Sequence, residues 1–462
     1  MDSIDLSKKI AKKNTASARQ DADPHQAPAS YQRHGRTTAI DDHSDLQVLK
    51  RIKRYLLPKD FVISQELLDE MVAGYDIGDP LADALTADGI RFAKPLQQFI
   101  IDDKKALIFE DDALLDNASF NVLSEQFSHH PDWFNLKLAH IGAIAYRRYP
   151  LMLIWLLRNV ALMAGYSIPA LSLPLLQTGA LMHDALPRLM RTYAYILAVS
   201  EHPPLHKPNT SAHNQHKPIE QVLAIGSEGW RQSIKVRQIH TLVRQNLLKG
   251  KANAATGGLS NADQHHLPDG SWNTAYWGIP INQTDMIATH LQFSLLIMRG
   301  LRLLGARIST EEAEGILHLW NLASYWMGVD LQRLPKDETA CWEWLYTYLS
   351  IQQLDFKMGQ PLAKALHDLP RQLMGEDNRR GRFVEMVNAS VTRTLVGDDI
   401  GDGLNLPKSK IRFGVLSSVP ILFVLDTARQ HNSTVADKLE TFRAKRQDNM
   451  NWWLKKNDAY YK

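Results

Sequence analysis

The sequence has 462 residues, 44% of them hydrophobic, so the chain is long enough to bury a sizeable core. Its 53 Lys and Arg against 50 Asp and Glu give a formal net charge of +3, too small to indicate a nucleic-acid or anionic-membrane surface. The single cysteine, Cys341, excludes an intrachain disulfide and a thiolate cluster for zinc or iron–sulfur.

Residues 1–45 are predicted to form a flexible tail, because they are polar and hold too few apolar residues to repay the entropy of ordering. No continuous apolar core of a signal peptide is visible at the start, so we expect a cytoplasmic protein. Residues 46–462 show long segments of helical periodicity, little strand-like alternation, and no internal repeat or linker. We therefore expect a single all-α domain.

Two strongly apolar runs raise the question of membrane insertion. Residues 151–166 are interrupted by Arg158, and residues 413–425 hold Pro420. Both are shorter than the stretch of about 20 apolar residues that a spanning helix needs. They are predicted to be buried core helices, with no membrane span.

The middle of the chain holds two polar insertions, residues 201–221 and 250–275, whose Pro, Gly and Asn content predicts loops. The histidines of the first insertion, and the pairs at 129–130 and 265–266, have no fixed helical spacing. Solvated side chains are therefore favoured over a metal site. Further along, Thr310 is followed by several glutamates and is expected to cap a helix, because a hydroxyl and early acidic residues satisfy its exposed N–H groups.

Between these loops, the segment KVRQIHTLVRQNLL at residues 235–248 carries a histidine on an apolar helical stripe that is predicted to turn inward. The stripe consists of Val236, His240, Val243 and Leu247. Arg237 and Arg244 lie three residues before and four after the histidine. Buried arginines need anionic partners, so an anion is expected beside this face.

Haem fits this demand, since an imidazole can bind iron while two propionates meet the arginines. Two alternatives stay open. The arginines could instead form salt bridges to Asp or Glu on neighbouring helices, and His240 could be a hydrogen-bonded core residue.

Five segments, in order along the chain, carry a resemblance to a known family. They are HPDWFNLKLAHIGAIAYRRYPLMLIWLLRNVALMAGYSIPALSLPLLQTGAL at 130–181, ALPRLMRT at 185–192, VRQIHTLVR at 236–244, WGIPINQTDMIATHLQFS at 277–294 and, more loosely, VTRTLVGDDIGDGLNLP at 391–407. The sequence resembles the latex clearing protein and rubber oxygenase family, which includes an endoplasmic-reticulum-bound fungal oxygenase that cleaves a farnesyl chain. The resemblance covers residues 125–410, approximately. It implies an all-α fold with a globin-like core, haem b, and dioxygen-dependent cleavage of a carbon–carbon double bond in an isoprenoid chain.

Residue by residue, the resemblance implies that His240 is the proximal iron ligand, with Arg237 and Arg244 beside the propionates or the haem edge. Thr289 is expected to approach the haem from the 277–294 segment, and Arg393 matches another arginine of the family more loosely.

On the distal side, the resemblance points to Arg188, Arg191 and Thr192 as catalytic residues. Arg191 replaces a lysine that binds iron in rubber-cleaving members, and arginine has no free lone pair for that role. The family's glutamate base is also absent, since Ser172 and Leu173 stand in its neighbourhood.

The sequence therefore predicts a haem b-dependent oxygenase that oxidises an apolar small molecule or polymer with dioxygen and has no nucleic-acid partner. The missing glutamate leaves an isoprenoid or a lipid-like molecule open as the substrate. A non-catalytic protein that binds haem or lipid for storage or sensing is the alternative.

Overall fold

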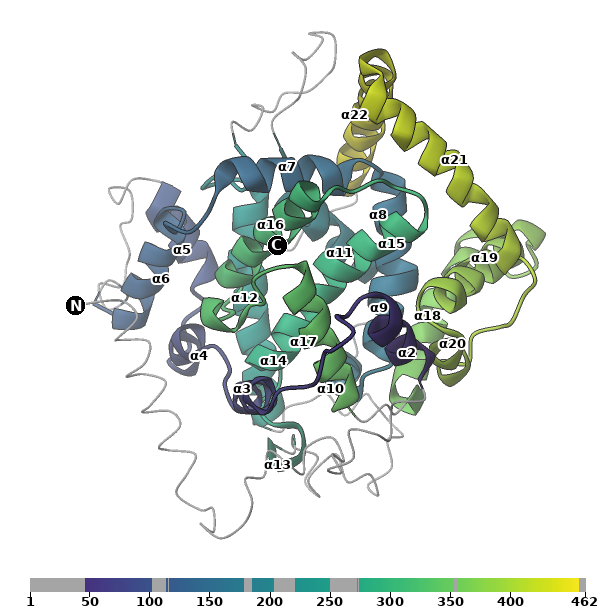
Figure 1. The fold of residues 1–462 in the computed structure, drawn as a ribbon. Helices are drawn as coiled ribbons and strands as arrows, with labels where there is room; N and C mark the ends of the chain where they lie inside the picture. The colour runs from purple at the N-terminus through teal and green to yellow at the C-terminus, as the bar shows by residue number, and fades with distance from the viewer. Residues whose placement is uncertain are drawn as a thin grey trace.

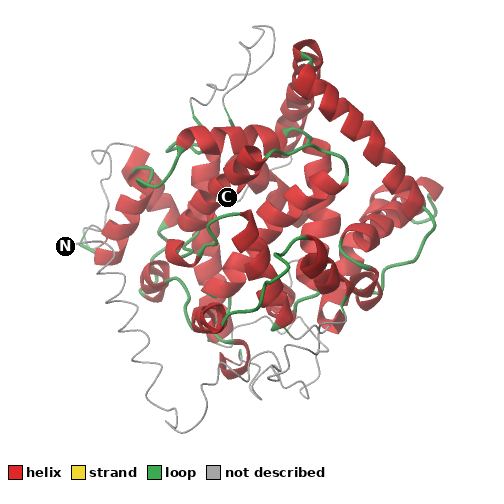
Figure 2. Cartoon of the chain, viewed as in Figure 1, coloured by secondary structure: helices red, strands yellow, loops and turns green. Residues whose placement is uncertain are grey.

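The computed structural model describes residues 46–101, 114, 116–177, 185–202, 221–249, 272, 274–352 and 356–456. Their regular secondary structure is helical, and no strand occurs among them (Figure 2), which confirms the all-α fold class. The predicted tail and most of the two predicted loops lie outside the described residues.

The first part of the chain forms α2 (Gln47–Tyr55), α3 (Gln65–Tyr75), α4 (Pro80–Ala87), α5 (Ala93–Ile101), α6 (Ala118–Ser128), α7 (Leu136–Arg147), α8 (Pro150–Leu156), the π-helical turn η4 (Leu157–Ala161), α9 (Leu162–Tyr166), α10 (Pro169–Gln177), α11 (Ala185–Val199) and α12 (Glu228–Leu248). The second part forms α13 (Thr274–Trp277), α14 (Gln283–Leu291), the π-helical turn η5 (Gln292–Leu296), α15 (Ile297–Leu303), α16 (Thr310–Trp326), the 3-10 turn η6 (Leu331–Arg333), α17 (Glu338–Ser350), α18 (Phe356–Met374), α19 (Arg379–Leu395), α20 (Asp398–Gly403), α21 (Arg412–His431) and α22 (Ser433–Lys456).

Helices α11, α12, α14 and α16 lie in the middle of the molecule, and α7 crosses above them in the view of Figure 1. The closest helix pair is α7 with α16, where Gly142 and Gly315 let the two backbones touch. A Cβ on Gly142 would lie 2.0 Å from the carbonyl carbon of Gly315, so neither position has room for a side chain. Helix α16 also packs against α12.

The start of α16 differs by one residue from the prediction. Ser309, and not Thr310, is the N-cap: its Oγ accepts a hydrogen bond from the Glu312 N–H at 3.2 Å. The Ser309 N–H in turn donates to Glu312 Oε2 at 2.9 Å. Thr310 is the first helical residue. The serine and the glutamate three residues later complete a capping box, which satisfies two N–H groups instead of one.

The two apolar runs differ in how deeply the structure buries them. Residues 151–166 form most of α8, η4 and α9 and are largely buried, as predicted. Residues 413–425 lie in α21, where Ile421 is 63% exposed and Val424 is 64% exposed, so the prediction of a buried core helix is wrong. Helices α21 and α22 form an arm at the side of the molecule (Figure 1), and among the described helices α21 packs mainly against α19 and α22.

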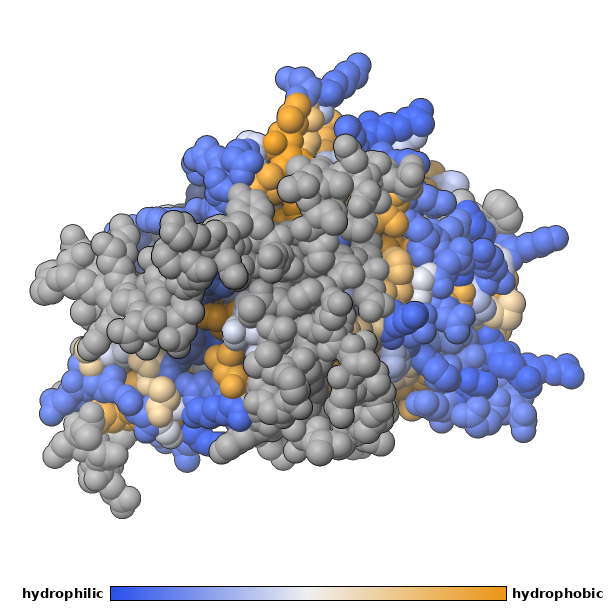
Figure 3. Space-filling view, turned by 90° about the horizontal axis from the view of Figure 1, so that it is seen from below, coloured by the Kyte–Doolittle hydropathy of each residue, from blue (hydrophilic) through white to orange (hydrophobic). Residues whose placement is uncertain are grey.

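Among the described helices, none taken singly is long and apolar enough to cross a membrane. Helices Leu136–Arg147 and Pro150–Tyr166 meet that criterion only as a pair, and they are bent by 81° relative to each other. Figure 3 shows that on the face seen from below, hydrophobic residues form strips between hydrophilic side chains.

Candidate functional site

His240 lies in the middle of α12, which begins at the N-cap Ser227 and runs through the centre of the fold. In the turns around His240, the more deeply buried side of this helix is polar, since Arg237, Thr241 and Arg244 are all buried. Of the predicted apolar stripe, only Leu247 is buried, and its other three members are half-buried. The helix is as predicted, but the stripe is not its innermost face.

Arg237 is held by an acid from a neighbouring helix. Its Nε donates to Asp79 Oδ2 at 2.6 Å, and its Nη2 donates to Asp79 Oδ1 at 2.9 Å. Its Nη1 also donates to Gln126 Oε1 at 3.1 Å. Asp79 is the N-cap of α4 and accepts the Ala82 N–H at 3.3 Å. One carboxylate thus starts α4 and ties it to α12.

Arg244, two turns further along α12, is held in the same way. Its Nη1 donates to Asp83 Oδ1 at 2.5 Å, and its Nε and Nη2 donate to the carbonyls of Pro280 and Ile281 at 2.9 and 2.7 Å. Burial raises the pKa of Asp83, and the charge of Asp79 acts in the same direction, while Arg244 lowers it. The carboxylate is costly to bury, and the guanidinium offsets part of that cost.

The anion expected beside this face is therefore supplied by α4. Asp79 and Asp83 provide the salt bridges that the sequence left open as an alternative, so Arg237 and Arg244 do not require an external carboxylate. Their role beside haem propionates stays a prediction from the resemblance.

The segment that contains Gln283 supports this arrangement. The Gln283 Nε2 donates to the carbonyls of Gly78 and Gly328 at 2.8 Å each, and its Oε1 accepts the Asp330 N–H at 2.8 Å. Asn282 caps α14 by accepting the N–H of Asp285 at 2.9 Å. The segment thus fixes the Pro280 and Ile281 carbonyls that bind Arg244. It also fixes Gly78 and Gly328, which lie beside the ion pairs of Arg244 and Arg237.

The His240 ring has no hydrogen-bond partner among the described residues. Part of the side chain is solvent-accessible, yet its Nδ1 is fully buried. Burial lowers the pKa of His240 to about 4, and Arg244 and Arg188 act in the same direction, while Asp79 opposes them. The imidazole is therefore neutral at pH 7 and has a free lone pair, as a metal ligand needs.

Arg188 on α11 is the predicted distal residue that the structure brings near His240, close enough to affect its pKa. It also acts on Tyr166, whose pKa burial raises to about 12 and Arg188 lowers in part. Arg188 is half-buried, and its guanidinium has no hydrogen bond or ion pair with a described residue. Thr192 Oγ1 donates to the Arg188 carbonyl at 3.1 Å, whereas Arg191 is exposed.

The other two predicted residues make contacts within their own parts of the fold. Thr289 is half-buried on α14, and its Oγ1 donates to the Asp285 carbonyl at 2.9 Å. Arg393 is buried on α19, donating to Asp402 at 2.8 Å and to the Pro407 carbonyl at 3.1 Å. Arg393 thus secures the turn that follows its helix, and its role toward a haem stays a prediction.

Sequence reasoning missed a second buried imidazole, His290 on α14. Its Nδ1 lies 2.9 Å from the Ser324 Oγ, and its Nε2 is buried without a hydrogen-bond partner in the described part of the chain. Burial lowers the pKa of His290 to about 3. It also missed Asp79 and Asp83, although Asp79 directly before Pro80 is a typical helix start that could have drawn attention to both.

Comparison with known proteins gives three matches. The model of the family "ER-bound oxygenase mpaB/B'/Rubber oxygenase, catalytic domain" matches residues 145–417. The rubber oxygenase of Streptomyces sp. (strain K30) is 26% identical over 188 residues, which are 39% of this chain and only 38% of that protein. The structure of latex clearing protein in the closed state covers 80% of this chain and 82% of its own, with 18% identity and a TM-score of 0.47.

The family model spans the part of the chain from α7 to α21, and so includes α11, α12, α14 and α19, which carry the predicted site residues. It covers more than half of the 462 residues. The chain therefore belongs to the family of ER-bound mpaB/B' oxygenases and rubber oxygenases, through their catalytic domain.

Proposed function

We propose that this protein is a haem b-dependent oxygenase that uses dioxygen to cleave a carbon–carbon double bond in an apolar isoprenoid or lipid-like substrate. Family membership supports the oxygenase class. The observation that carries the haem assignment is His240, a neutral imidazole on a central helix with no hydrogen-bond partner among the described residues. With its lone pair free, His240 would hold the haem iron.

One residue near His240 also fits a haem. Arg188 is a cation near the imidazole with no acidic partner in the described part of the chain, and it can meet a propionate or a reacting oxygen. Bound haem would supply the redox chemistry through which dioxygen reacts with the double bond.

The chain's own residues would hold and orient these components. The ion pairs of Arg237 and Arg244 fix α12 against α4 on both sides of His240, and so fix the direction of the imidazole. Arg188 places a positive charge where negative charge develops during the reaction, which stabilises the transition state. Thr192 bonds to the carbonyl of Arg188 and so steadies that turn of α11.

The proposed reaction balances without an external reductant. One carbon–carbon double bond and one dioxygen molecule give two carbonyl groups, and each oxygen atom ends in one product carbonyl. Labelled dioxygen should therefore appear in both products.

The haem assignment is tested by the absorption spectrum of the purified full chain, before and after adding pyridine. We expect a Soret band and the pyridine spectrum of haem b, and loss of both in His240→Ala. The matched control is His290→Ala, which removes the other buried imidazole and should retain the haem. A wild-type chain that takes up no haem after reconstitution, or haem loss in His290→Ala alone, would overturn the assignment.

Oxygenase activity is tested by dioxygen consumption with short polyisoprenes and unsaturated lipids. Arg188→Ala should reduce the rate at least about tenfold, because removal of a charge-stabilising donor typically costs that much or more. Arg188→Lys should recover part of it, and Arg380→Ala, which removes an exposed arginine on α19, should leave it unchanged. A haem-loaded protein that oxidises no substrate of this panel would instead be a haem or lipid binder.

A further inference from the structure

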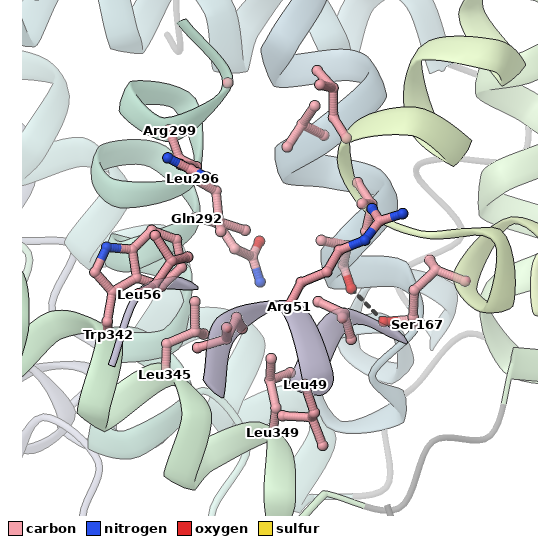
Figure 4. Close-up of a pocket in the computed structure, with 18 of the residues that line it drawn as sticks. Leu49, Arg51, Leu56, Ser167, Gln292, Leu296, Arg299, Trp342, Leu345 and Leu349 are labelled. Atoms are coloured by element: carbon pink, nitrogen blue, oxygen red, sulfur yellow. Dashed lines mark hydrogen bonds between the residues drawn. The ribbon is translucent and has the colours of Figure 1, made fainter. Parts of the chain in front are cut away.

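A cavity of about 340 Å³ lies between α2, α9, α15, α17 and the end of α19 (Figure 4). Its volume falls within the range of small-molecule sites, about 300–1,000 Å³. None of the site residues discussed above lines it. Its walls are mainly apolar and include Leu49, Ile52, Val160, Leu296, Leu345 and Leu349.

One amide points into this apolar space. Gln292 is only 7% exposed, and its side-chain amide makes no hydrogen bond with a described residue and points into the cavity (Figure 4). Gly165 opposite leaves room for it, since a Cβ there would lie 2.8 Å from the Gln292 Oε1. A buried amide without a hydrogen-bond partner destabilises the fold, so the arrangement points to a ligand with an oxygen atom next to the Gln292 amide.

The backbone around Gln292 is unusual as well. Gln292 opens the π-helical turn η5, which packs against the second π-helical turn, η4. Both turns contribute to the wall, through Val160 of η4 and through Gln292 and Leu296 of η5. Such turns are rare and are often found at functional sites, because they redirect side chains that a regular α-helix would place elsewhere.

The cavity lining is also positively charged. It contains Arg51 and Arg299, on opposite sides in Figure 4, and none of its residues is acidic. Arg51 donates to the Thr394 carbonyl at 3.2 Å, whereas the Arg299 guanidinium has no hydrogen bond or ion pair with a described residue. The neighbouring Arg302, by contrast, pairs with an acid of α17 at 2.5 Å. The charge of that acid, Glu338, also reaches Arg299 but forms no direct ion pair with it, so the half-buried Arg299 guanidinium keeps its donors for an anionic ligand.

We propose that this cavity binds a single-chain amphiphile with a terminal carboxylate and an oxygen along its chain. The carboxylate pairs with the Arg299 guanidinium, the chain lies against the apolar walls, and the Gln292 amide hydrogen-bonds to the chain oxygen. This site is separate from the haem chemistry proposed above and does not depend on it.

The carboxylate is tested by calorimetric titration of the full chain with dodecanoate and with dodecan-1-ol. Dodecanoate should bind at least about tenfold more tightly, because a charge-assisted pair is roughly twice as strong as a neutral hydrogen bond. Arg299→Gln should remove this preference, and Arg299→Lys should restore part of it. Arg380→Gln, an equal charge change at an exposed position of α19 that does not line the cavity, should have no effect.

The chain oxygen is tested with hydroxydodecanoates that carry the hydroxyl at successive positions. One position should bind more tightly than dodecanoate, and Gln292→Met should abolish that gain while leaving dodecanoate binding within about twofold, since methionine is a volume-conserving replacement. Shorter carboxylates should bind about fourfold more weakly for each methylene removed, as expected for chain burial.

Two results would overturn this proposal. One is equal binding of the acid and the alcohol by the wild-type chain, and the other is a carboxylate preference that Arg299→Gln leaves intact. The same titration with His240→Ala separates this proposal from the previous one, because loss of haem should leave dodecanoate binding unchanged.

Discussion

Arg237 and Asp79 form a two-point ion pair one turn before His240, with donor–acceptor distances of 2.6 and 2.9 Å and both side chains buried. The geometry matches the guanidinium fork to the carboxylate. Because Asp79 also caps α4, this one acid determines where α4 starts and how α12 lies against it. The direction of the His240 ring therefore depends on a residue that no haem-ligand motif includes.

Asp79→Asn should destabilise the fold by about 3 kcal/mol, because it leaves the Arg237 charge buried without a counter-charge. Asparagine is as good an N-cap as aspartate, so the change isolates the charge from the cap. Urea unfolding of the chain without haem measures the loss.

The control for this variant is Lys364→Gln, which removes an ion pair between the exposed Lys364 and Asp368 within α18. Exposed pairs contribute under about 1 kcal/mol, so stability should barely change. Equal small losses in both variants would mean that the buried pair does not hold α12 in place.

The contrast between Arg237 and the valines of α12 shows what the sequence can predict. Helical periodicity correctly predicted a helix over residues 235–248, which lie in α12, because spacing along a helix is local information. Which face is innermost depends on the partner helix. Asp79 and Asp83 lie more than 150 residues away from their arginines in sequence, so only the tertiary fold shows that the arginine face is buried.

The same reasoning explains the error at α21. Its composition is that of a core helix, but burial depends on whether other helices enclose it, and α21 packs mainly against α19 and α22. The cavity beneath α2 could not be predicted from the sequence either, since its walls come from five separate parts of the chain. His240, in contrast, could be selected from the sequence because the resemblance and the flanking arginines both pointed to it.

Gly328→Ala should be severely destabilising for reasons of packing. Gly328 has a φ of +92°, and a Cβ there would lie 2.3 Å from Asp79 Oδ2 and 3.0 Å from Arg237 Nε. Gly375→Ala is the matched control, since it has a φ of +103° and nothing within 4 Å of an added Cβ. The control should cost only the backbone strain of about 1–2 kcal/mol. Thermal or urea unfolding of both variants gives the difference, and similar costs would contradict a packing role for Gly328.

Gln283→Met should cost at least about 3 kcal/mol, because it leaves two buried carbonyls and one N–H without the partner they have in the wild-type chain. Methionine keeps the length and volume of the side chain. Gln65→Met is the control on the exposed side of α3, where one hydrogen bond to Asp69 at 2.8 Å is lost and stability should change by about 0.5 kcal/mol or less. If the urea midpoint of Gln283→Met equals that of the wild-type chain, contacts other than Gln283 hold the Gly78 and Gly328 carbonyls in place.

The pKa of His240 predicts how the stability of the haem-free chain depends on pH. Its folded pKa is about 4, below the ordinary value of 6.5, so as pH falls the unfolded chain takes up this proton first. The stability that the neutral ring contributes is complete above pH 6.5 and is lost as pH falls toward 4. His240→Gln should therefore flatten the plot of unfolding free energy against pH in this window, by up to about 1.4 kcal/mol per pH unit.

Urea titrations at several pH values between these limits measure that slope. The comparison variant is His290→Gln. The pKa of His290 in the folded chain is about 3, so the stability contributed by the neutral His290 ring should be lost over a pH range that extends lower than the range for His240. The other partly buried histidines contribute equally to all three proteins and cancel in the difference. Identical slopes for the wild-type chain and His240→Gln would show that the ring is hydrated in the folded state, and would remove the physical basis for treating it as an available metal ligand.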